Sequence, residues 1–279
     1  MSEEKKSFFA SLEPKSAVIV GLVAGVLVIC SVGFLVMLGM YFSKSGNSII
    51  DKSDAPADDV ADNPADAAPV VQAPKSDKPV VELFVMSYCP YGLQMQKAFT
   101  PVMKLLGSKA DMSIKFVSYA MHGQKEVEEN TRQYCIESEQ PAKFIAYVDC
   151  FSVSSDSVAC QKTVGINESK MNACVDKTNK QFKTMELFND QSTWLSGQYP
   201  QYPVHASLNE KYGVQGSPTL VINGAQVESN RSAEAIKTVV CEAFNNKPAE
   251  CSQTLSTASA SAGFGAGTGA DTAGAECGP

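Results

Sequence analysis

The sequence predicts an α/β domain that follows a single membrane-spanning helix. The hydropathy pattern of residues 79–251 gives the order strand, helix, strand, then a mostly helical block, then strand, strand and helix. An uncharged apolar run over residues 17–42 is long enough to cross a bilayer. Nine cysteines in 279 residues are typical of a protein that works in an oxidising compartment, where disulfides persist.

The apolar run reads "AVIVGLVAGVLVICSVGFLVMLGMYF" and carries no charged side chain. A helix of this length covers a hydrocarbon core of about 30 Å with some tilt. The alternative is a cleaved secretory signal, whose apolar region is usually about 7–15 residues and ends at small side chains. This run ends in Met40, Tyr41 and Phe42, so it favours a transmembrane helix.

The charges around the run predict its orientation. Lys5, Lys6 and Lys15 precede it, and a strongly acidic stretch follows it. The positive-inside rule therefore predicts a short cytoplasmic N-terminus, residues 1–16, and an extracytoplasmic C-terminal domain, periplasmic or extracellular. Lys44 and Lys52 follow the run, so the difference in positive charge between its two sides is small.

Two glycines in the run, Gly21 and Gly25, have the small-xxx-small spacing found where membrane helices pair. This spacing predicts a weak homodimer in the membrane.

Two segments have the composition of disordered chain. Residues 43–78 form a linker rich in Ala, Asp and Pro, and residues 252–279 form a tail rich in Gly, Ala and Ser. Between them, residues 79–251 form the predicted domain. The net charge of −7, with no basic stripe, argues against a nucleic-acid partner.

The domain's elements follow from local patterns. "VVELFVMS" from Val80 predicts a strand, and apolar residues at helical spacing follow "CPYG". Residues 112–120 predict a second strand, and residues 124–191 are mostly helical in pattern. "SPTLVING" predicts a strand with an Asn-Gly hairpin turn, and Ser232 is placed to cap a last amphipathic helix.

Six cysteines of the domain predict a disulfide framework, with 15 pairings possible in principle. Cys241 and Cys251 are close in sequence and far from the rest, so we expect them to pair, which leaves three arrangements for the other four: Cys135, Cys150, Cys160 and Cys174. The sequence holds no Cys-x-x-Cys pair and only two histidines, so we expect no metal site. No cofactor is expected either.

Cys89 lies where a predicted strand passes into a helix. A helix N-terminus lowers the pKa of a thiol, and the thiolate is the nucleophile in disulfide exchange. Pro90 suits the first helical position, where its missing N–H costs nothing. The alternative is an ordinary buried cysteine in a turn.

A strand, Cys-Pro-Tyr-x, a helix and a later Ser-Pro before a strand resemble the thioredoxin superfamily. The resemblance implies that Cys89 is the catalytic nucleophile and that Pro218 is a cis proline lying against it. It also implies that Ser217 offers backbone groups to a substrate, with Tyr91 and Pro218 lining the same substrate-binding site.

A second motif, "HGQKEVEENTRQYC" from His122 to Cys135, resembles the signature of the gamma-interferon-inducible lysosomal thiol reductases. Five positions fit at fixed spacing: His122, Gly123, Glu126, Asn130 and Cys135. Val127 replaces the inner cysteine of that signature. The resemblance, and a more distant one to the periplasmic disulfide oxidoreductase A group, implies a thioredoxin-like fold with a helical insertion, about residues 124–191. His122 is a candidate supporting residue of the site, and the alternative is a hydrogen-bonded structural histidine.

Gly92 departs from the Cys-x-x-Cys of these families. In the two-cysteine mechanism the second thiol attacks the mixed disulfide and releases the substrate. Here that thiol has three candidate sources: a client cysteine, a small thiol or redox partner protein, and Cys277. About 25 residues separate Cys251 from Cys277, and as a coil they span about 25–30 Å.

The sequence therefore predicts a membrane-anchored extracytoplasmic thiol–disulfide oxidoreductase or isomerase that acts on protein thiols through the single nucleophile Cys89. The alternative is a non-catalytic module of the same fold that binds extended or unfolded peptide.

Overall fold

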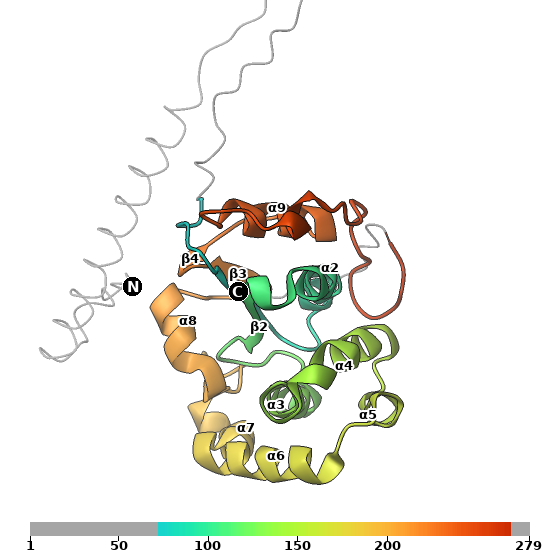
Figure 1. The fold of residues 1–279 in the computed structure, drawn as a ribbon. Coiled ribbons are helices and arrows are strands. Elements are labelled where there is room, and N and C mark those ends of the chain that lie inside the picture. Colours follow the sequence, from blue (N-terminus) through green and yellow to red (C-terminus); the bar gives the residue numbers. More distant parts are fainter. Residues whose placement is uncertain (1–71, 269–279) are drawn as a thin grey trace, which may run out of the picture. The chain divides into compact units, whose positions relative to one another are not determined.

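A computed structural model describes residues 72–268 (Figure 1). Its centre is a four-stranded sheet in the order β2-β1-β3-β4. The first two strands are parallel, and the last two run antiparallel to their neighbours. The strands are β1 (Val80–Val85), β2 (Asp111–Phe116), β3 (Thr219–Ile222) and β4 (Ala225–Gln226).

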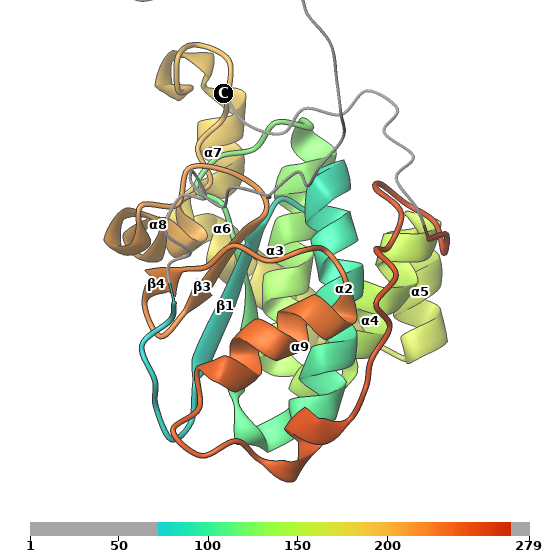
Figure 2. The same ribbon diagram turned by 90° about the horizontal axis from the view of Figure 1, so that it is seen from above.

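Helices cover both faces of the sheet (Figures 1 and 2). Side chains of β1 alternate: Val81, Leu83 and Val85 enter the large core beneath α2 and α9, whereas Phe84 and Met86 enter a second cluster beside α8. This period of two is what a strand buried on both faces requires. The helices concerned are α2 (Pro90–Leu106), α8 (Ala206–Tyr212) and α9 (Ala233–Glu242), and short 3-10 turns lie at Gly107–Lys109 (η2), Gln191–Thr193 (η3) and Pro203–His205 (η4).

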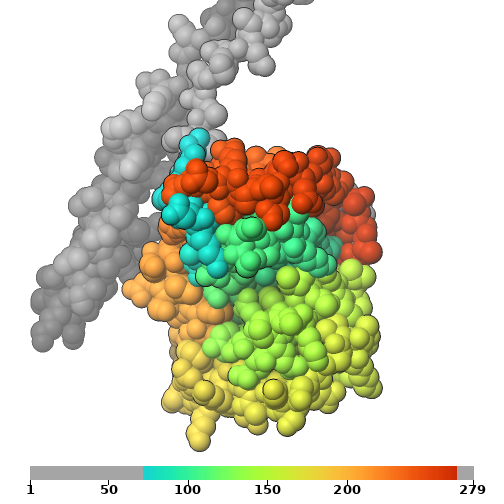
Figure 3. Space-filling view, viewed as in Figure 1, coloured from blue at the N-terminus to red at the C-terminus, as the bar shows by residue number. Residues whose placement is uncertain are grey.

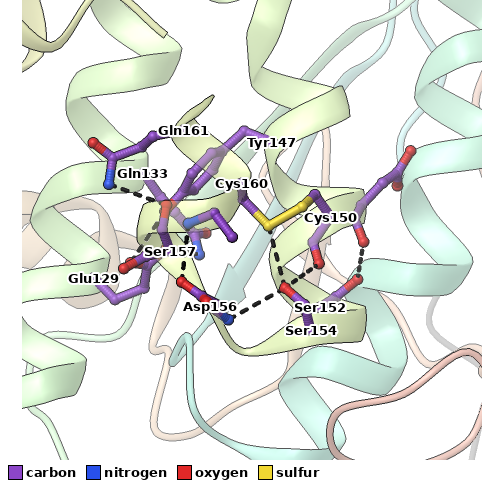
Figure 4. The surroundings of a disulfide bond; sticks show 12 residues. Glu129, Gln133, Tyr147, Cys150, Ser152, Ser154, Asp156, Ser157, Cys160 and Gln161 are labelled. Atoms are coloured by element: carbon purple, nitrogen blue, oxygen red, sulfur yellow. Dashed lines mark hydrogen bonds between the residues drawn. A yellow bond between two sulfur atoms is a disulfide. The ribbon is translucent and has the colours of Figure 1, made fainter. Parts of the chain in front are cut away.

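Five helices form a block between β2 and the second half of the sheet, shown in green and yellow in Figure 1. They are α3 (Gln124–Glu139), α4 (Pro141–Ser154), α5 (Ser157–Val164), α6 (Glu168–Phe182) and α7 (Thr184–Asn189). Disulfides join α3 to α6 through Cys135–Cys174 and α4 to α5 through Cys150–Cys160. The second of these lies near a group of buried polar side chains on α3 (Figure 4).

The last part of the sheet forms as its local sequence predicts. Asn223 and Gly224 both have positive φ, 50° and 85°, as the tight hairpin turn between β3 and β4 requires. The Ser232 hydroxyl accepts a hydrogen bond from the Ala235 amide and caps α9. Cys241 at the end of α9 pairs with Cys251 in η5 (Ala249–Ser252), which is the pair that the sequence favoured.

The order of elements predicted from the sequence is confirmed, including the helical block. The second strand is shorter than predicted, since it ends at Phe116. Beyond it the Ser118 amide donates to the Asn209 side chain of α8, and Tyr119 forms an isolated antiparallel bridge with Gln201.

Residues 252–268 differ from the expectation of a disordered tail. They pack on the domain as the red segment of Figures 2 and 3 and make specific hydrogen bonds to α2 and α9. The residue composition does not predict this packing, because the segment is held by its backbone carbonyls and one aromatic side chain. The rest of the predicted tail lies outside the described residues.

Within residues 72–268, no helix is both long and apolar enough to cross a membrane. The predicted span at residues 17–42, with Gly21 and Gly25, and most of the predicted linker lie outside the described range.

Candidate functional site

Cys89 is the N-cap of α2, and Pro90 takes the first helical position. Its sulfur accepts a hydrogen bond from the Gly92 amide at 3.4 Å. The residue is fully buried. Because the sulfur faces the free N–H groups at the positive end of a 17-residue helix, a negative charge on it is stabilised.

A cis peptide bond between Ser217 and Pro218 lies against this cysteine, at the start of β3. The Cys89 sulfur is 3.5 Å from the Ser217 carbonyl oxygen. The Ser217 hydroxyl accepts a hydrogen bond from the Met86 amide at 2.9 Å. Two loops that are far apart in sequence are therefore fixed against each other around the sulfur.

The sheet order, the helix that begins at Cys89 and the cis proline before β3 together decide the architecture. The fold is thioredoxin-like. Pro218 is half-buried and borders a cleft of about 80 Å³, with Met95, Thr219 and Arg231 among the residues that line it. The cleft lies between the start of β3, β4 and the middle of the first turns of α2, and Cys89 is not among its lining residues.

Solved structures with a similar arrangement include disulfide oxidoreductases of bacteria. Reduced DsbA from Mycobacterium tuberculosis has 15% sequence identity and a TM-score of 0.45, covering 66% of this chain and 92% of that chain. DsbG from the same organism has 15% identity and a TM-score of 0.43, covering 66% and 88%. BdbD from Bacillus subtilis has 18% identity and a TM-score of 0.41, covering 61% and 90%. No family model and no curated protein matches the sequence.

Gly92 is the position at which the sequence departs from the Cys-x-x-Cys pattern, and the space beside it is filled. A β-carbon added there would lie 2.6 Å from the Ser217 hydroxyl oxygen and 3.0 Å from the Met86 carbonyl oxygen. The serine cannot simply rotate away, because its hydroxyl is held by the Met86 amide. The lack of a side chain at position 92 therefore goes together with the serine before the cis proline, whose hydroxyl fills that space. The sequence did not reveal this contact.

The motif from His122 to Cys135, at the start of α3, holds the loop that precedes Cys89. The buried Glu126 carboxylate accepts hydrogen bonds from the amides of Met121, His122 and Tyr88. The Asn130 side-chain oxygen accepts from the Ser87 amide at 3.0 Å. These two residues therefore position the strand-to-helix turn that carries the cysteine.

The two neighbours of the Cys89–Pro90 turn each carry a cation that sequence proximity did not predict. The Lys125 ammonium lies 4.6 Å from the ring centre of Tyr88, and the Arg231 guanidinium lies 4.6 Å from that of Tyr91. Burial raises the pKa of Tyr88, so this ring stays neutral. Both cations come from segments that are far from this turn in sequence.

The two histidines have different surroundings. His122 Nδ1 lies 2.5 Å from the Glu126 carboxylate, next to the loop that holds Cys89. His205 lies in the core, where its Nδ1 accepts a hydrogen bond from the Phe116 amide, and burial lowers its pKa to about 3. A supporting role of His122 in the chemistry stays a prediction.

Cys89 is disulfide-bonded in this structure. The other six cysteines of the described range pair among themselves. Cys277, the candidate resolving cysteine, also lies outside that range. No cluster of three or more His, Cys, Asp or Glu side chains in the described range could hold a metal ion.

Proposed function

We propose that this protein is a membrane-anchored extracytoplasmic thiol–disulfide oxidoreductase or isomerase that acts on protein thiols through Cys89. The observation that carries the proposal is the position of the Cys89 sulfur, which caps α2 and faces the Ser217–Pro218 peptide. The membrane anchor rests on the apolar run of residues 17–42.

The reactive form is the Cys89 thiolate. The Gly92 amide and the positive end of α2 stabilise it, because both direct partial positive charge at the sulfur. The thiolate attacks one sulfur of a client disulfide, which forms a mixed disulfide and releases the other client sulfur as a thiolate.

The groove beside Pro218 holds the client during this step. An extended peptide placed there has access to the Ser217 backbone, and the half-buried ring of Tyr91 borders the same end of α2. Main-chain hydrogen bonds accept many sequences, which suits a protein with varied clients.

Because Gly92 carries no thiol, the mixed disulfide is not resolved from within the turn of the helix. A second client thiolate that attacks its own mixed disulfide releases Cys89 and completes an isomerisation. An incoming thiol that attacks instead completes a reduction or an oxidation of the client, depending on its own oxidation state.

The test is trapping of clients by the full-length chain in its membrane. Cells are quenched with acid, thiols are alkylated, and mixed disulfides are resolved on non-reducing gels and identified by mass spectrometry. We expect disulfide-linked clients with the wild-type chain and none with Cys89→Ser. Thr163→Ser, a conservative change at an exposed position of α5, is the control and keeps them.

Clients that remain bound without a disulfide, in equal amount in wild type and Cys89→Ser, would contradict the proposal and support the peptide-binding module instead. A chain that binds nothing in either form would contradict both functions.

A further inference from the structure

The C-terminal segment, residues 255–268, lies on α2 at the end that carries Cys89 (Figure 2). The Gln94 side chain donates to the Ala260 carbonyl at 2.7 Å. The Gly263 amide donates to the carbonyl of Pro90 at 2.9 Å. The segment therefore contacts the residue directly after the cysteine.

Lys97 fixes this segment to the helix. Its ammonium donates to the Ser261 hydroxyl and to the carbonyls of Gly263 and Gly265, at 3.2, 2.9 and 3.0 Å. An ammonium has three hydrogens to donate, so all of them are used on one short segment. Lys97 is half-buried, and this burial lowers its pKa.

Phe264 anchors the same segment on the other side of the cysteine. Its ring packs edge-to-face against Tyr88 and Phe151, with centroids 5.5 and 5.4 Å apart. The Gly265 amide donates to the Ser152 carbonyl on α4 at 3.2 Å. Contacts with Tyr88 and Pro90 place this segment against both sequence neighbours of Cys89.

Outside the described range the sequence holds two further cysteines, Cys30 and Cys277. Cys30 falls inside the run predicted to span the membrane. Cys277 follows the docked segment by nine residues, which reach about 30 Å when extended.

Nine extended residues are long enough to bring Cys277 from the docked segment to the Cys89 sulfur. Thr268 bridges to Ala260, which is bonded to Gln94. Gln94 is only five residues along α2 from Cys89, an axial rise of about 7.5 Å. The end of the docked segment therefore lies within the extended reach of nine residues from the Cys89 sulfur.

We propose that residues 255–268 are a docked arm that presents Cys277 to Cys89 as the second redox thiol, in place of the cysteine missing at position 92. This rests on the proposed function of Cys89 and names the source of its resolving thiol.

The reaction balances as an exchange of two electrons. The Cys277 thiolate attacks the Cys89 sulfur of a Cys89–client mixed disulfide, so that a Cys89–Cys277 bond forms and the client sulfur leaves as a thiolate. The client disulfide is reduced to two thiols, and the two cysteines are oxidised to one disulfide. The protons of the two protein thiols pass through solvent to the client sulfurs. An external dithiol then reduces the internal disulfide.

Docking has a measurable consequence. A flexible tether gives a second group an effective concentration in the millimolar range. An arm fixed by Lys97 and Phe264 gives a higher effective concentration than a flexible tether, because fewer residues of the chain are free to change conformation. The stability of the internal disulfide relative to a small thiol measures that effective concentration directly.

The first test is a non-reducing peptide map of the full-length chain, alkylated before digestion. We expect Cys89 and Cys277 in one linked peptide. A Cys89–Cys30 peptide, or Cys89 recovered in alkylated form from the oxidised protein, would overturn the proposal.

The second test equilibrates the full-length chain in glutathione buffers and measures the oxidised fraction of Cys89. We expect Lys97→Met and Phe264→Ala each to lower the effective concentration of the second thiol at least tenfold. Lys104→Met, a lysine two turns further along α2 that bonds to Asp149 and not to the arm, is the matched control and leaves it unchanged. Equal values for all four proteins would overturn the docked arm.

Client trapping separates this proposal from the proposed function. With Cys277→Ser we expect mixed disulfides of Cys89 to accumulate several-fold, because release is slowed. Clients trapped in the same amount as with wild type would overturn the arm but leave Cys89 as the nucleophile. No trapping in either protein would overturn the proposed function itself.

Discussion

The half of the molecule built on the sheet and the helical insertion are stabilised by different means. The sheet half buries apolar strands between helices and keeps polar groups for the turn around Cys89. The insertion is crossed by two disulfides and encloses buried polar side chains on α3: Glu129, Asn130, Thr131 and Gln133. The comparison teaches that the sheet half is stabilised mainly by apolar packing, whereas the insertion also depends on a few strong interactions that can be removed singly.

The largest expected effect comes from the buried charge of the insertion. Glu129 is fully buried, bonds to Arg132 and accepts hydrogen bonds from Gln133 and Tyr147. Burial raises the pKa of Glu129, and the arginine opposes this rise. Glu129→Ala leaves the arginine without its partner, so we expect the free energy of unfolding to fall by about 3–5 kcal/mol.

Urea unfolding of the purified full-length chain measures this change. Glu128→Ala, the exposed neighbour on α3, is the control and should change stability by less than about 0.5 kcal/mol. A loss below about 1 kcal/mol in Glu129→Ala would show that the insertion does not depend on this charge.

The next effect concerns the disulfides. Replacing Cys135 and Cys174 together by serine opens a loop with a separation of 39 residues, and chain entropy predicts a loss of about 4 kcal/mol. The same change at Cys150 and Cys160, separated by 10 residues, predicts about 3 kcal/mol. Thermal unfolding should rank the two variants in that order, and alkylation of reduced Cys89 should keep its rate in both.

A smaller effect tests the sheet half. Gly92→Cys forces a β-carbon against the Ser217 hydroxyl, so we expect a loss of about 1–3 kcal/mol from overpacking. Gly92→Ala should cost about the same, because the β-carbon and not the thiol causes the clash. Adding Ser217→Ala should recover part of the loss, and a Gly92→Cys chain as stable as wild type would show that the turn is looser than its contacts indicate.

The smallest effects lie at the junction between the halves. Two titratable groups there contribute to stability with opposite dependence on pH. His205 stacks on Phe116 of β2 and lies edge-on to Tyr134 of α3. Glu137 of α3 accepts a hydrogen bond from the Ile114 amide of β2. Burial lowers the pKa of His205 to about 3 and raises the pKa of Glu137 to about 7.

The unfolded chain binds the proton of His205 more readily, so this histidine's contribution is present above pH 6.5 and is lost as pH falls towards 3. The contribution of Glu137 is present below pH 4.5 and is lost as pH rises through 7. Between these limits the slopes oppose each other, at about 1.4 kcal/mol per pH unit each.

We therefore expect the pH-dependent contributions of His205 and Glu137 to cancel from about pH 4.5 to 6.5. His205→Gln should lose stability as pH rises across this range, and Glu137→Gln should lose it as pH falls. Denaturant unfolding at several pH values measures the slopes, and slopes of the same sign in both variants would contradict the assignment.

The sequence predicted what local pattern determines. The strand at "VVELFVMS", the Ser232 cap and the Asn223-Gly224 turn each depend on neighbours a few residues away, and each forms as expected. The position of Cys89 at the start of α2 followed from the same kind of signal.

The rest depends on contacts between residues far apart in sequence. The hydroxyl of Ser217 fills the space beside Gly92, although 125 positions separate the two residues. Lys97 holds carbonyls of a Gly-rich segment whose composition suggested disorder. Neither contact leaves a periodic pattern, so no local reading of the sequence could have found it.

The pKa of Cys89 tests the central claim most directly. The full-length chain is reduced, and the rate of Cys89 alkylation is followed by mass spectrometry between pH 4 and 10, with Cys89→Ser to correct for other thiols. A thiol that caps α2 is predicted to titrate well below the ordinary value of about 8.5. A midpoint at or above about 8.5 would contradict the assignment of Cys89 as the nucleophile.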